Sequence, residues 1–254
     1  RHDGHHHGNG GKLAESIRLK PKRRPTRPQS GTVHTIATPT ETHATTCTLF
    51  SERILKTGKR LRTEHFTSTV WLGSGPEIAP LEEGATAIGE INAESIYRRF
   101  FHGKGFQVLE SAHNILAKTM NCSGMVNHAA IGANLSSQPL VLEAAFQGAG
   151  LHTMITEGVL ALPAGIEALV QESHVIEGQV LSLRVQRNNE NYDVDVLQED
   201  RCLLKLRGFS MAQLGPLPES DRFDVLPEGT QFASATVEEG NEEGLLNADE
   251  VKAV

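Results

Sequence analysis

Cysteine and long apolar runs are scarce in this chain of 254 residues, and each shortage excludes a class of protein. The three cysteines, Cys47, Cys122 and Cys202, are too few and too far apart for a disulfide framework or a cysteine metal site. They predict small buried thiols in a reducing cytoplasm. No apolar run is long enough to cross a bilayer, and no hydrophobic stretch follows a charged start as in a signal peptide. We therefore expect a cytoplasmic protein with no membrane partner and no metal.

Net positive charge is also lacking, because the formal net charge is -7. Residues 1–30 hold eight Lys or Arg and two Asp or Glu, whereas residues 216–254 hold two basic and ten acidic residues. The basic stretch "LKPKRRPTRPQ" has no interleaved aromatic residue and is rich in proline, which disfavours nucleic acid as a partner. The opening "RHDGHHHGNGG" has four histidines among glycines, which give metal ligands no fixed geometry. We expect a flexible leader over residues 1–11 and an acidic tail or linker over residues 216–254.

Patterns typical of β-strands dominate the middle of the chain. The stretch "GTVHTIATPTETHATTCTLFSERIL" is rich in Thr and β-branched residues, and it predicts two strands around a turn near Pro39. Residues 65–72 alternate apolar and polar side chains, as a half-buried strand does. Glycine and proline in "GSGPEIAPLEEGATAIG" predict a linker. Further on, "QVLSLRVQRNNENYDVDVLQEDRCLLKLRGFSM" predicts three strands with turns at residues 188–189 and 199–200.

One helix interrupts these strands, in the stretch "QPLVLEAAFQGAGLHTMITEG". Pro139 near its start and Gly158 near its end are the usual punctuation of a helix. Apolar residues lie on nearly every side of it, which predicts a buried helix wrapped by a sheet. Glu143 and Gln147 are four residues apart, so both act on the same small volume. Glu143 is either a buried structural partner of an arginine or a backbone amide, or a general acid with a raised carboxyl pKa.

A second unusual stretch is "YRRFFHGKGFQVLESA", residues 97–112. Glycines on both sides of Lys104 allow a tight backbone path or the close approach of a ligand. His102 lies on this turn, and a strand is expected from Phe106 onward. The stretch alone fits either a plain entry into a strand or the lip of a substrate pocket.

In this order and spacing, "IYRRFFHGKGFQVLESA", "PLVLEAAFQGAGL" and "LALPAGIEALV" resemble the C-terminal half of a polyketide-synthase-type dehydratase domain. The similarity is greatest to the dehydratase-like regions of bacterial synthases related to polyunsaturated fatty acid synthases. It covers roughly residues 12–215 of this chain. The resemblance implies an α+β fold, the double hot-dog, in which each half wraps an antiparallel sheet around a long helix.

The resemblance also implies roles for individual residues. Glu143 and Gln147 stand where the family has its catalytic acid and, four residues later, Gln or His, with Glu replacing the commoner Asp. The turn matches the family's Gly-Pro-Phe-Gln stretch beside the acyl pocket, although Lys104-Gly105 replaces the usual Gly-Pro. The residues that the resemblance places at the substrate are His102, Gly103, Phe106, Gln107, Pro163 and Gly165.

The first half of the family pattern is incomplete in this sequence. The family's catalytic histidine belongs to a His-x-x-x-Gly-x-x-x-x-Pro motif, which this chain lacks. We therefore expect one complete hot-dog plus part of another. Residues 12–75 would supply strands of the partial N-terminal hot-dog, residues 76–95 a linker, and residues 96–215 the C-terminal hot-dog.

The implied activity is that of a lyase without a cofactor. It removes water from a β-hydroxyacyl chain held as a thioester on an acyl carrier protein: a His takes the α-proton and an acid helps the β-hydroxyl to leave. Three hypotheses follow: a dehydratase domain or section of a multidomain polyketide or fatty acid synthase, a non-catalytic dehydratase-like structural or acyl-binding module, or a hot-dog thioesterase in which Glu143 activates water. Because the histidine motif is missing, we expect this chain alone to be inactive.

The implied partners are an acyl carrier protein with a phosphopantetheine-linked acyl chain and the other domains of a synthase. A second copy of the chain is a further candidate. An incomplete first half leaves an apolar face and sheet edges without their usual cover, and such surfaces favour pairing. We therefore expect a homodimer or a poorly soluble monomer.

Overall fold

The computed structural model describes residues 13–18, 33–41, 43–72, 77–87, 89–126 and 138–224. The expected flexible leader and most of the expected acidic tail lie outside these residues, so both remain expectations. In the part of the chain that the structure describes, no helix is long and apolar enough to cross a membrane.

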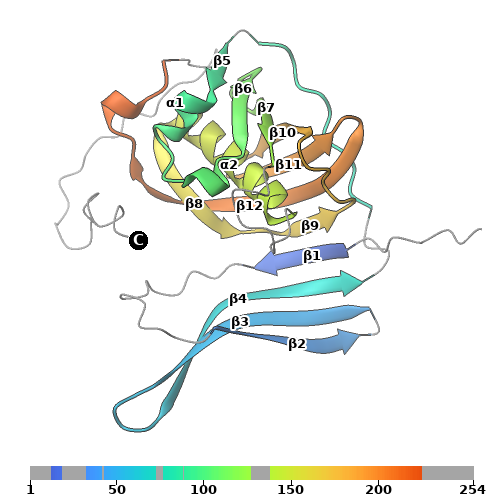
Figure 1. Ribbon diagram of the computed structural model, residues 1–254, viewed down its shortest axis with the longest axis vertical. Helices are drawn as coiled ribbons and strands as arrows, with labels where there is room; N and C mark the ends of the chain where they lie inside the picture. The colour runs from blue at the N-terminus through green and yellow to red at the C-terminus, as the bar shows by residue number, and fades with distance from the viewer. Residues whose placement is uncertain are drawn as a thin grey trace, which may run out of the picture.

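One long helix and twelve strands make up most of the described structure (Figure 1). The helices are α1 (Ala93–Tyr97) and α2 (Gln138–Glu157), with short 3-10 turns η1 (Lys104–Phe106) and η3 (Glu219–Asp221). The strands are β1 (Leu13–Arg18), β2 (Val33–Glu41), β3 (Ala44–Ile54), β4 (Arg60–Leu72), β5 (Glu90–Asn92), β6 (Leu109–His113), β7 (Thr119–Met125), β8 (Val159–Gly165), β9 (Ala168–Gln171), β10 (Val180–Asn188), β11 (Asn191–Gln198) and β12 (Arg201–Pro216).

All of these strands belong to one antiparallel sheet in the order β2-β3-β4-β1-β9-β12-β11-β10-β7-β6-β5, with β8 paired to β12 beside this path. The sheet has two parts, joined where β1 pairs with β9. We call strands β5 to β12 together with α2 the helix-wrapped part, and strands β1 to β4 the four-strand part. The two parts lie one above the other in Figure 1, with β1 and β9 at their junction.

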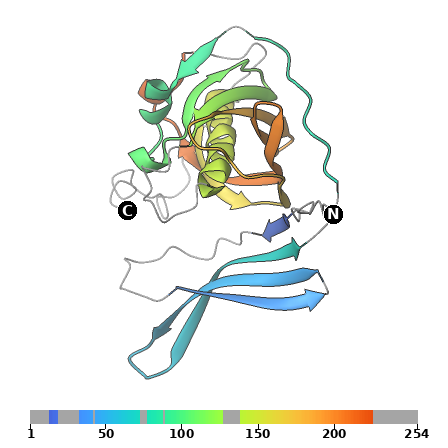
Figure 2. The same ribbon diagram turned by 45° about the vertical axis from the view of Figure 1, so that its right-hand side comes forward.

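In the helix-wrapped part, the sheet curls around α2 so that the helix lies inside it (Figures 1 and 2). Leu140, Val141, Leu151 and Ile155 of the helix are nearly or completely inaccessible to solvent. They belong to one hydrophobic cluster with residues of β6, β7 and β9 to β12, such as Phe209. The apolar helix therefore packs against strands on several sides, as its sequence predicts. The expected α+β fold, an antiparallel sheet wrapped around a long helix, is confirmed.

Turns in the chain fall close to the places that the sequence predicts, with two corrections. Asn189 and Glu199 have φ angles of 56° and 54°, and they form the turns between β10 and β11 and between β11 and β12. The turn between β2 and β3 is at His43, because Pro39 pairs with Thr45 inside the strand. The strand expected from Phe106 begins only at residue 109, because the preceding residues form η1.

The connection between the two parts runs along the outer face of the helix-wrapped part. Residues 77–87 have no helix or strand, and the sheet resumes at β5 within the expected linker. Side chains of the sheet bind this segment. Asp195 Oδ2 accepts the Leu81 N–H at 2.7 Å, and Lys205 Nζ donates to the Ile78 carbonyl at 2.7 Å. The connection is therefore fastened to β11 and β12 by its own backbone.

Candidate active site

Glu143 and Gln147 lie one turn apart on α2, on the face that points toward residues 100–106. The helix spacing brings their side chains into contact, and Gln147 Nε2 donates to Glu143 Oε1 at 2.8 Å. Gln147 is 1% exposed, whereas the Glu143 side chain is 20% exposed. The carboxylate is therefore at the boundary between the packed core and an opening.

His102 is the second partner of Glu143. Its Nε2 lies 2.9 Å from Glu143 Oε1, the oxygen that also binds Gln147. Two rings hold the imidazole: Phe101 stacks on it with centroids 4.7 Å apart, and Phe100 meets it edge-on at 5.0 Å. The turn that leads into η1 therefore places His102 in direct contact with the carboxylate of Glu143 on α2.

The amide of Gln147 is fixed by hydrogen bonds on both of its ends. Gln147 Nε2 donates to the Phe106 carbonyl at 2.6 Å, and its Oε1 accepts from the Tyr97 hydroxyl at 2.7 Å. The Tyr97 oxygen in turn accepts the Leu109 N–H at 2.6 Å. Burial raises the pKa of Tyr97 well above its usual range, so the hydroxyl keeps its proton and donates. The NH₂ end of Gln147 therefore faces Glu143.

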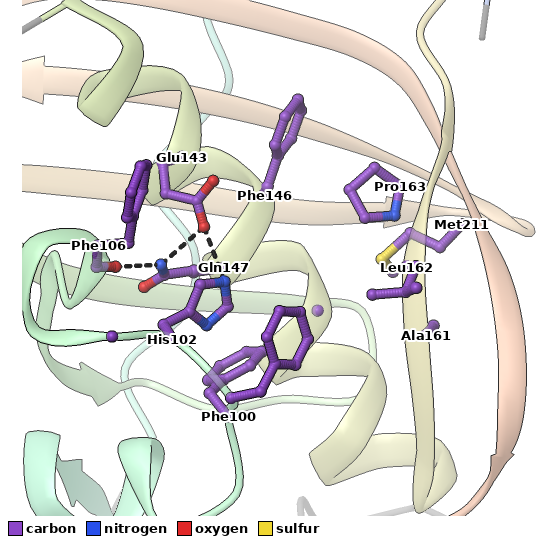
Figure 3. Close-up of a pocket in the computed structure, with 13 residues that line it drawn as sticks. Phe100, His102, Phe106, Glu143, Phe146, Gln147, Ala161, Leu162, Pro163 and Met211 are labelled. Carbon is purple, nitrogen blue, oxygen red and sulfur yellow. Dashed lines mark hydrogen bonds and ion pairs between the residues drawn. The ribbon is translucent and has the colours of Figure 1, made fainter. Parts of the chain in front are cut away.

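A cavity of about 390 Å³ opens beside these polar groups (Figure 3). Figure 3 shows its walls coming from three places: α2, the turn before η1, and strands β8 and β12. Most of the wall is apolar, and Phe146 is held in place by a stack on Phe209 with centroids 4.9 Å apart. The lining residues are Phe100, Phe101, His102, Gly103, Phe106, Glu143, Phe146, Gln147, Gly150, Ala161, Leu162, Pro163 and Met211.

Six of the eight residues that the sequence singles out line this cavity. They are His102, Gly103, Phe106, Glu143, Gln147 and Pro163. The other two do not line it. Gln107 turns back, and its Nε2 donates to the His102 carbonyl at 3.0 Å. Gly165 pairs with Ser210 on β12, and a Cβ added there would lie 2.9 Å from Ser210 Oγ. Gln107 supports the turn, and Gly165 lets two strands approach closely.

Several important residues of the site escape sequence reasoning. Tyr97 and Phe100 lie in the aromatic stretch before the His-Gly-Lys-Gly turn, and their clustering was an available signal. Phe146 is three residues after Glu143 and so shares its helix face. Met211 had no signal at all, because only the curvature of β12 brings it to the cavity.

A second histidine, His152, is buried in the core. His152 is 0% exposed, and its ring nitrogens lie 3.0 Å from the Tyr192 hydroxyl and 2.9 Å from the Leu116 carbonyl. Burial lowers the pKa of His152 from 6.5 to about 4, so the ring is neutral in the folded protein near neutral pH. Among the described residues, no group of three His, Cys, Asp or Glu side chains could hold a metal ion.

The cavity can bind an apolar chain and present one carboxyl group to it. The lining side chains of β8 and β12 are apolar, so the only titratable groups on the described cavity wall are Glu143 and His102. These two already bind each other through Glu143 Oε1. The geometry is thus that of a single acid-bearing helix facing a space for an apolar ligand.

Comparison with solved structures identifies the fold. The dehydratase domain of the CurK module of the curacin polyketide synthase superposes with a TM-score of 0.63 at 17% identity, covering 81% of this chain and 76% of that chain. The dehydratase domain of the CurF module gives a TM-score of 0.62 at 16% identity, covering 81% and 77%. That of RzxB from Pseudomonas fluorescens gives 0.60 at 16% identity, covering 80% and 76%. The chain therefore has the fold of polyketide synthase dehydratase domains, as the resemblance implies.

Sequence comparison adds nothing to this structural similarity. No protein-family model matches the chain, and no curated protein sequence matches it either.

Proposed function

We propose that this chain is a dehydratase section of a multidomain polyketide or fatty acid synthase. Its substrate would be a β-hydroxyacyl thioester carried by an acyl carrier protein, and the reaction would remove water from it. One observation carries the proposal: Glu143, on the helix inside a dehydratase fold, presents its carboxyl group at the wall of an apolar cavity. An apolar cavity suits an acyl chain, and a carboxylic acid suits the departure of a hydroxyl group.

The two halves of the elimination need different groups. A base takes the proton from the α-carbon, and the electrons of that bond form the double bond as the β-carbon loses its hydroxyl. The hydroxyl leaves as water with a proton from an acid, for which we propose Glu143. Two neighbouring structures of the CurK dehydratase are described as inactive mutants, one with a histidine replaced by phenylalanine and one with an aspartate replaced by asparagine. These variants favour a scheme with one histidine and one carboxyl group.

Among the described residues that line this cavity, Glu143 supplies the acid of that scheme and no histidine is free to act as its base. The Nδ1 atom of His102 is buried and its Nε2 binds Glu143, so the ring does not present a free nitrogen to a substrate. We propose that the base comes from another segment of the synthase, which agrees with the missing histidine motif. The expected division into a partial hot-dog over 12–75, a linker over 76–95 and a complete hot-dog over 96–215 is part of this proposal, as are cytoplasmic location and the synthase partners.

Binding and product analysis test the proposal. The full chain is titrated with β-hydroxyacyl pantetheine thioesters by calorimetry, and the mixture is then analysed by mass spectrometry. We expect binding without turnover. Met211→Trp, which fills the cavity, should weaken binding at least tenfold, whereas Leu214→Trp on the same strand should not, because Leu214 is 44% exposed and outside the cavity lining.

The products separate the alternatives. An enoyl thioester that is lost in Glu143→Gln would support the dehydratase and overturn the expectation that the chain alone is inactive. Free acid would identify a thioesterase instead. Equal binding to wild type and Met211→Trp would contradict any role for this cavity.

A non-catalytic acyl-binding module is the second candidate. It is favoured by the absence of a free base among the described cavity residues. In that case an assembled synthase that contains Glu143→Gln would retain its dehydration, whereas the proposed dehydratase would lose it.

A further inference from the structure

The ring of His102 has a property that its contact with Glu143 does not explain. Its Nδ1 atom is buried and has no hydrogen-bonding partner in the described part of the chain. Buried polar atoms nearly always have a partner, so each exception calls for a physical reason. The reason concerns which nitrogen of the ring carries the proton.

We infer that His102 is a neutral hydrogen-bond donor that positions the carboxyl group of Glu143, with its proton on Nε2. The importance of this role for catalysis rests on the proposed function of Glu143. The hydrogen bond between the two side chains is inferred from their contacts and is independent of that function.

Two nitrogen atoms lie within hydrogen-bonding distance of one oxygen of the Glu143 carboxylate. Glu143 Oε1 lies 2.8 Å from Gln147 Nε2 and 2.9 Å from His102 Nε2. The amide of Gln147 is oriented by Tyr97 and Phe106, so it donates to Oε1. A carboxylate oxygen accepts two such hydrogen bonds, and the second is made if His102 Nε2 carries a hydrogen.

A proton on Nδ1 does not fit the described surroundings of the ring. This nitrogen lies in a ring held between Phe100 and Phe101, whose side chains offer no acceptor. A proton there would be a buried N–H donor without a partner among the described residues, and such donors are rarer than unsatisfied acceptors. A charged imidazolium has protons on both nitrogens, so it meets the same obstacle. The neutral ring with hydrogen on Nε2 is the form that fits.

The consequence lies at the other oxygen of Glu143. Figure 3 shows Oε2 pointing away from both His102 and Gln147, and the described residues provide no hydrogen bond to it. The titratable groups facing Glu143 are His102 from the turn and Tyr97 from α1, while β8 and β12 contribute apolar walls. Gln147 and His102 thus hold Oε1 as neutral donors, and Oε2 stays free to meet a substrate hydroxyl.

Nuclear magnetic resonance of the full chain tests this inference without any turnover. ¹⁵N spectra of the histidine rings, assigned with His102→Gln, report which nitrogens carry protons. Near neutral pH we expect the neutral form of His102 with hydrogen on Nε2. ¹³C spectra of labelled Glu side chains at a fixed pH, assigned with Glu143→Gln, report the hydrogen bonding of the Glu143 carboxyl group.

The two variants of His102 have different expected effects. His102→Phe keeps a ring but removes the donor, so the ¹³C signal of the Glu143 carboxyl carbon should move from its wild-type position. His102→Gln keeps an N–H at nearly the same place and should restore that position. A merely structural histidine would move the signal in neither variant, or in both alike.

Other outcomes overturn the inference directly. They are an imidazolium at neutral pH, a proton on Nδ1, or a Glu143 carboxyl signal that His102→Phe leaves unchanged. Circular dichroism checks that both variants keep α2. A chain that gives the expected spectra but binds no thioester would refute the proposed function and leave the positioning role of His102 intact.

Discussion

The two parts of the sheet show what a helix adds to a set of strands. In the helix-wrapped part, residues from α2 and from the strands around it form one buried cluster. In the four-strand part, only Ala44 and Phe50 are buried apolar residues among the described side chains. Both parts have regular antiparallel pairing with long strands. Backbone hydrogen bonds therefore suffice to pair the strands, but a hydrophobic core needs an apolar face of the sheet packed against an apolar face of another element.

The strands of the two parts also differ in how many apolar side chains their sequences supply for burial. Strand β10 alternates buried and more exposed side chains, so that Leu181, Leu183 and Val185 are buried. Strands β2 and β3 are rich in Thr, which favours extended backbone but adds little apolar surface. The four-strand part leaves large side chains in solvent, including Val33 at 59% and Phe66 at 46% exposure. Its strands have β propensity without the burial that stabilises a sheet.

The largest expected effect is the loss of one core side chain. Leu151 of α2 is 0% exposed, so Leu151→Ala should lower the free energy of unfolding by about 2–5 kcal/mol. Leu61 of β4 is 36% exposed, so the matched change Leu61→Ala should lower it by less than about 1 kcal/mol. Denaturant titration followed by far-ultraviolet circular dichroism measures both.

The single tryptophan gives this comparison a second probe. Trp71 lies in β4, so its fluorescence reports the four-strand part, whereas circular dichroism is dominated by α2. A part with few buried side chains should unfold at lower denaturant concentration. The two parts would instead form one cooperative core if fluorescence and circular dichroism gave coincident transitions, and if Leu151→Ala and Leu61→Ala lowered the free energy of unfolding equally.

Acid should destabilise the helix-wrapped part through His152. Burial lowers the pKa of this histidine from 6.5 to about 4, so the unfolded chain binds its proton more readily than the folded chain. The folded state therefore keeps its full stability with respect to this group above pH 6.5 and loses stability as the pH falls toward 4. A pKa shift of this size corresponds to a loss of about 3 kcal/mol in the free energy of unfolding. Denaturation of wild type at a series of pH values measures the loss.

A variant without the titrating ring isolates this contribution. His152→Gln should be less stable at neutral pH, because the contacts with Tyr192 and Leu116 are disturbed. Its stability should nevertheless depend less steeply on pH between 6.5 and 4. Parallel pH profiles for wild type and variant would show that other groups cause the acid sensitivity.

Local sequence patterns predicted the elements of the helix-wrapped part well. The buried helix was visible because apolar residues surround it and Pro139 and Gly158 mark its ends, and the turns near 189 and 199 followed from polar pairs between alternating strands. The pair Glu143 and Gln147 needed only helix spacing. These features depend on residues that are close together in the sequence.

The rest depends on contacts between distant segments. The meeting of His102 with Glu143 joins residues 41 positions apart, and no periodicity encodes it. Met211 reaches the cavity only because β12 bends around α2. Gln107 and Gly165 were expected at the cavity from a resemblance, yet local packing turns one toward a carbonyl and places the other against Ser210. Tertiary packing, which a single sequence does not display, decides such details.

Substitution of an exposed residue in the four-strand part should have the smallest effect on the free energy of unfolding. The same substitution should have a clear effect on association between copies of the chain. Phe66 is 46% exposed in β4, within the four-strand part, which contains no helix among the described residues. If this surface pairs with a second copy, Phe66→Lys introduces charge at the contact and should lower the average mass at high concentration. Ile176 is 50% exposed in the helix-wrapped part and supplies the matched control, Ile176→Lys. Both changes should alter the free energy of unfolding by less than about 0.5 kcal/mol, because neither residue is buried. Light scattering over a concentration series distinguishes them, and a monodisperse wild-type monomer would show that the exposed strands need no partner.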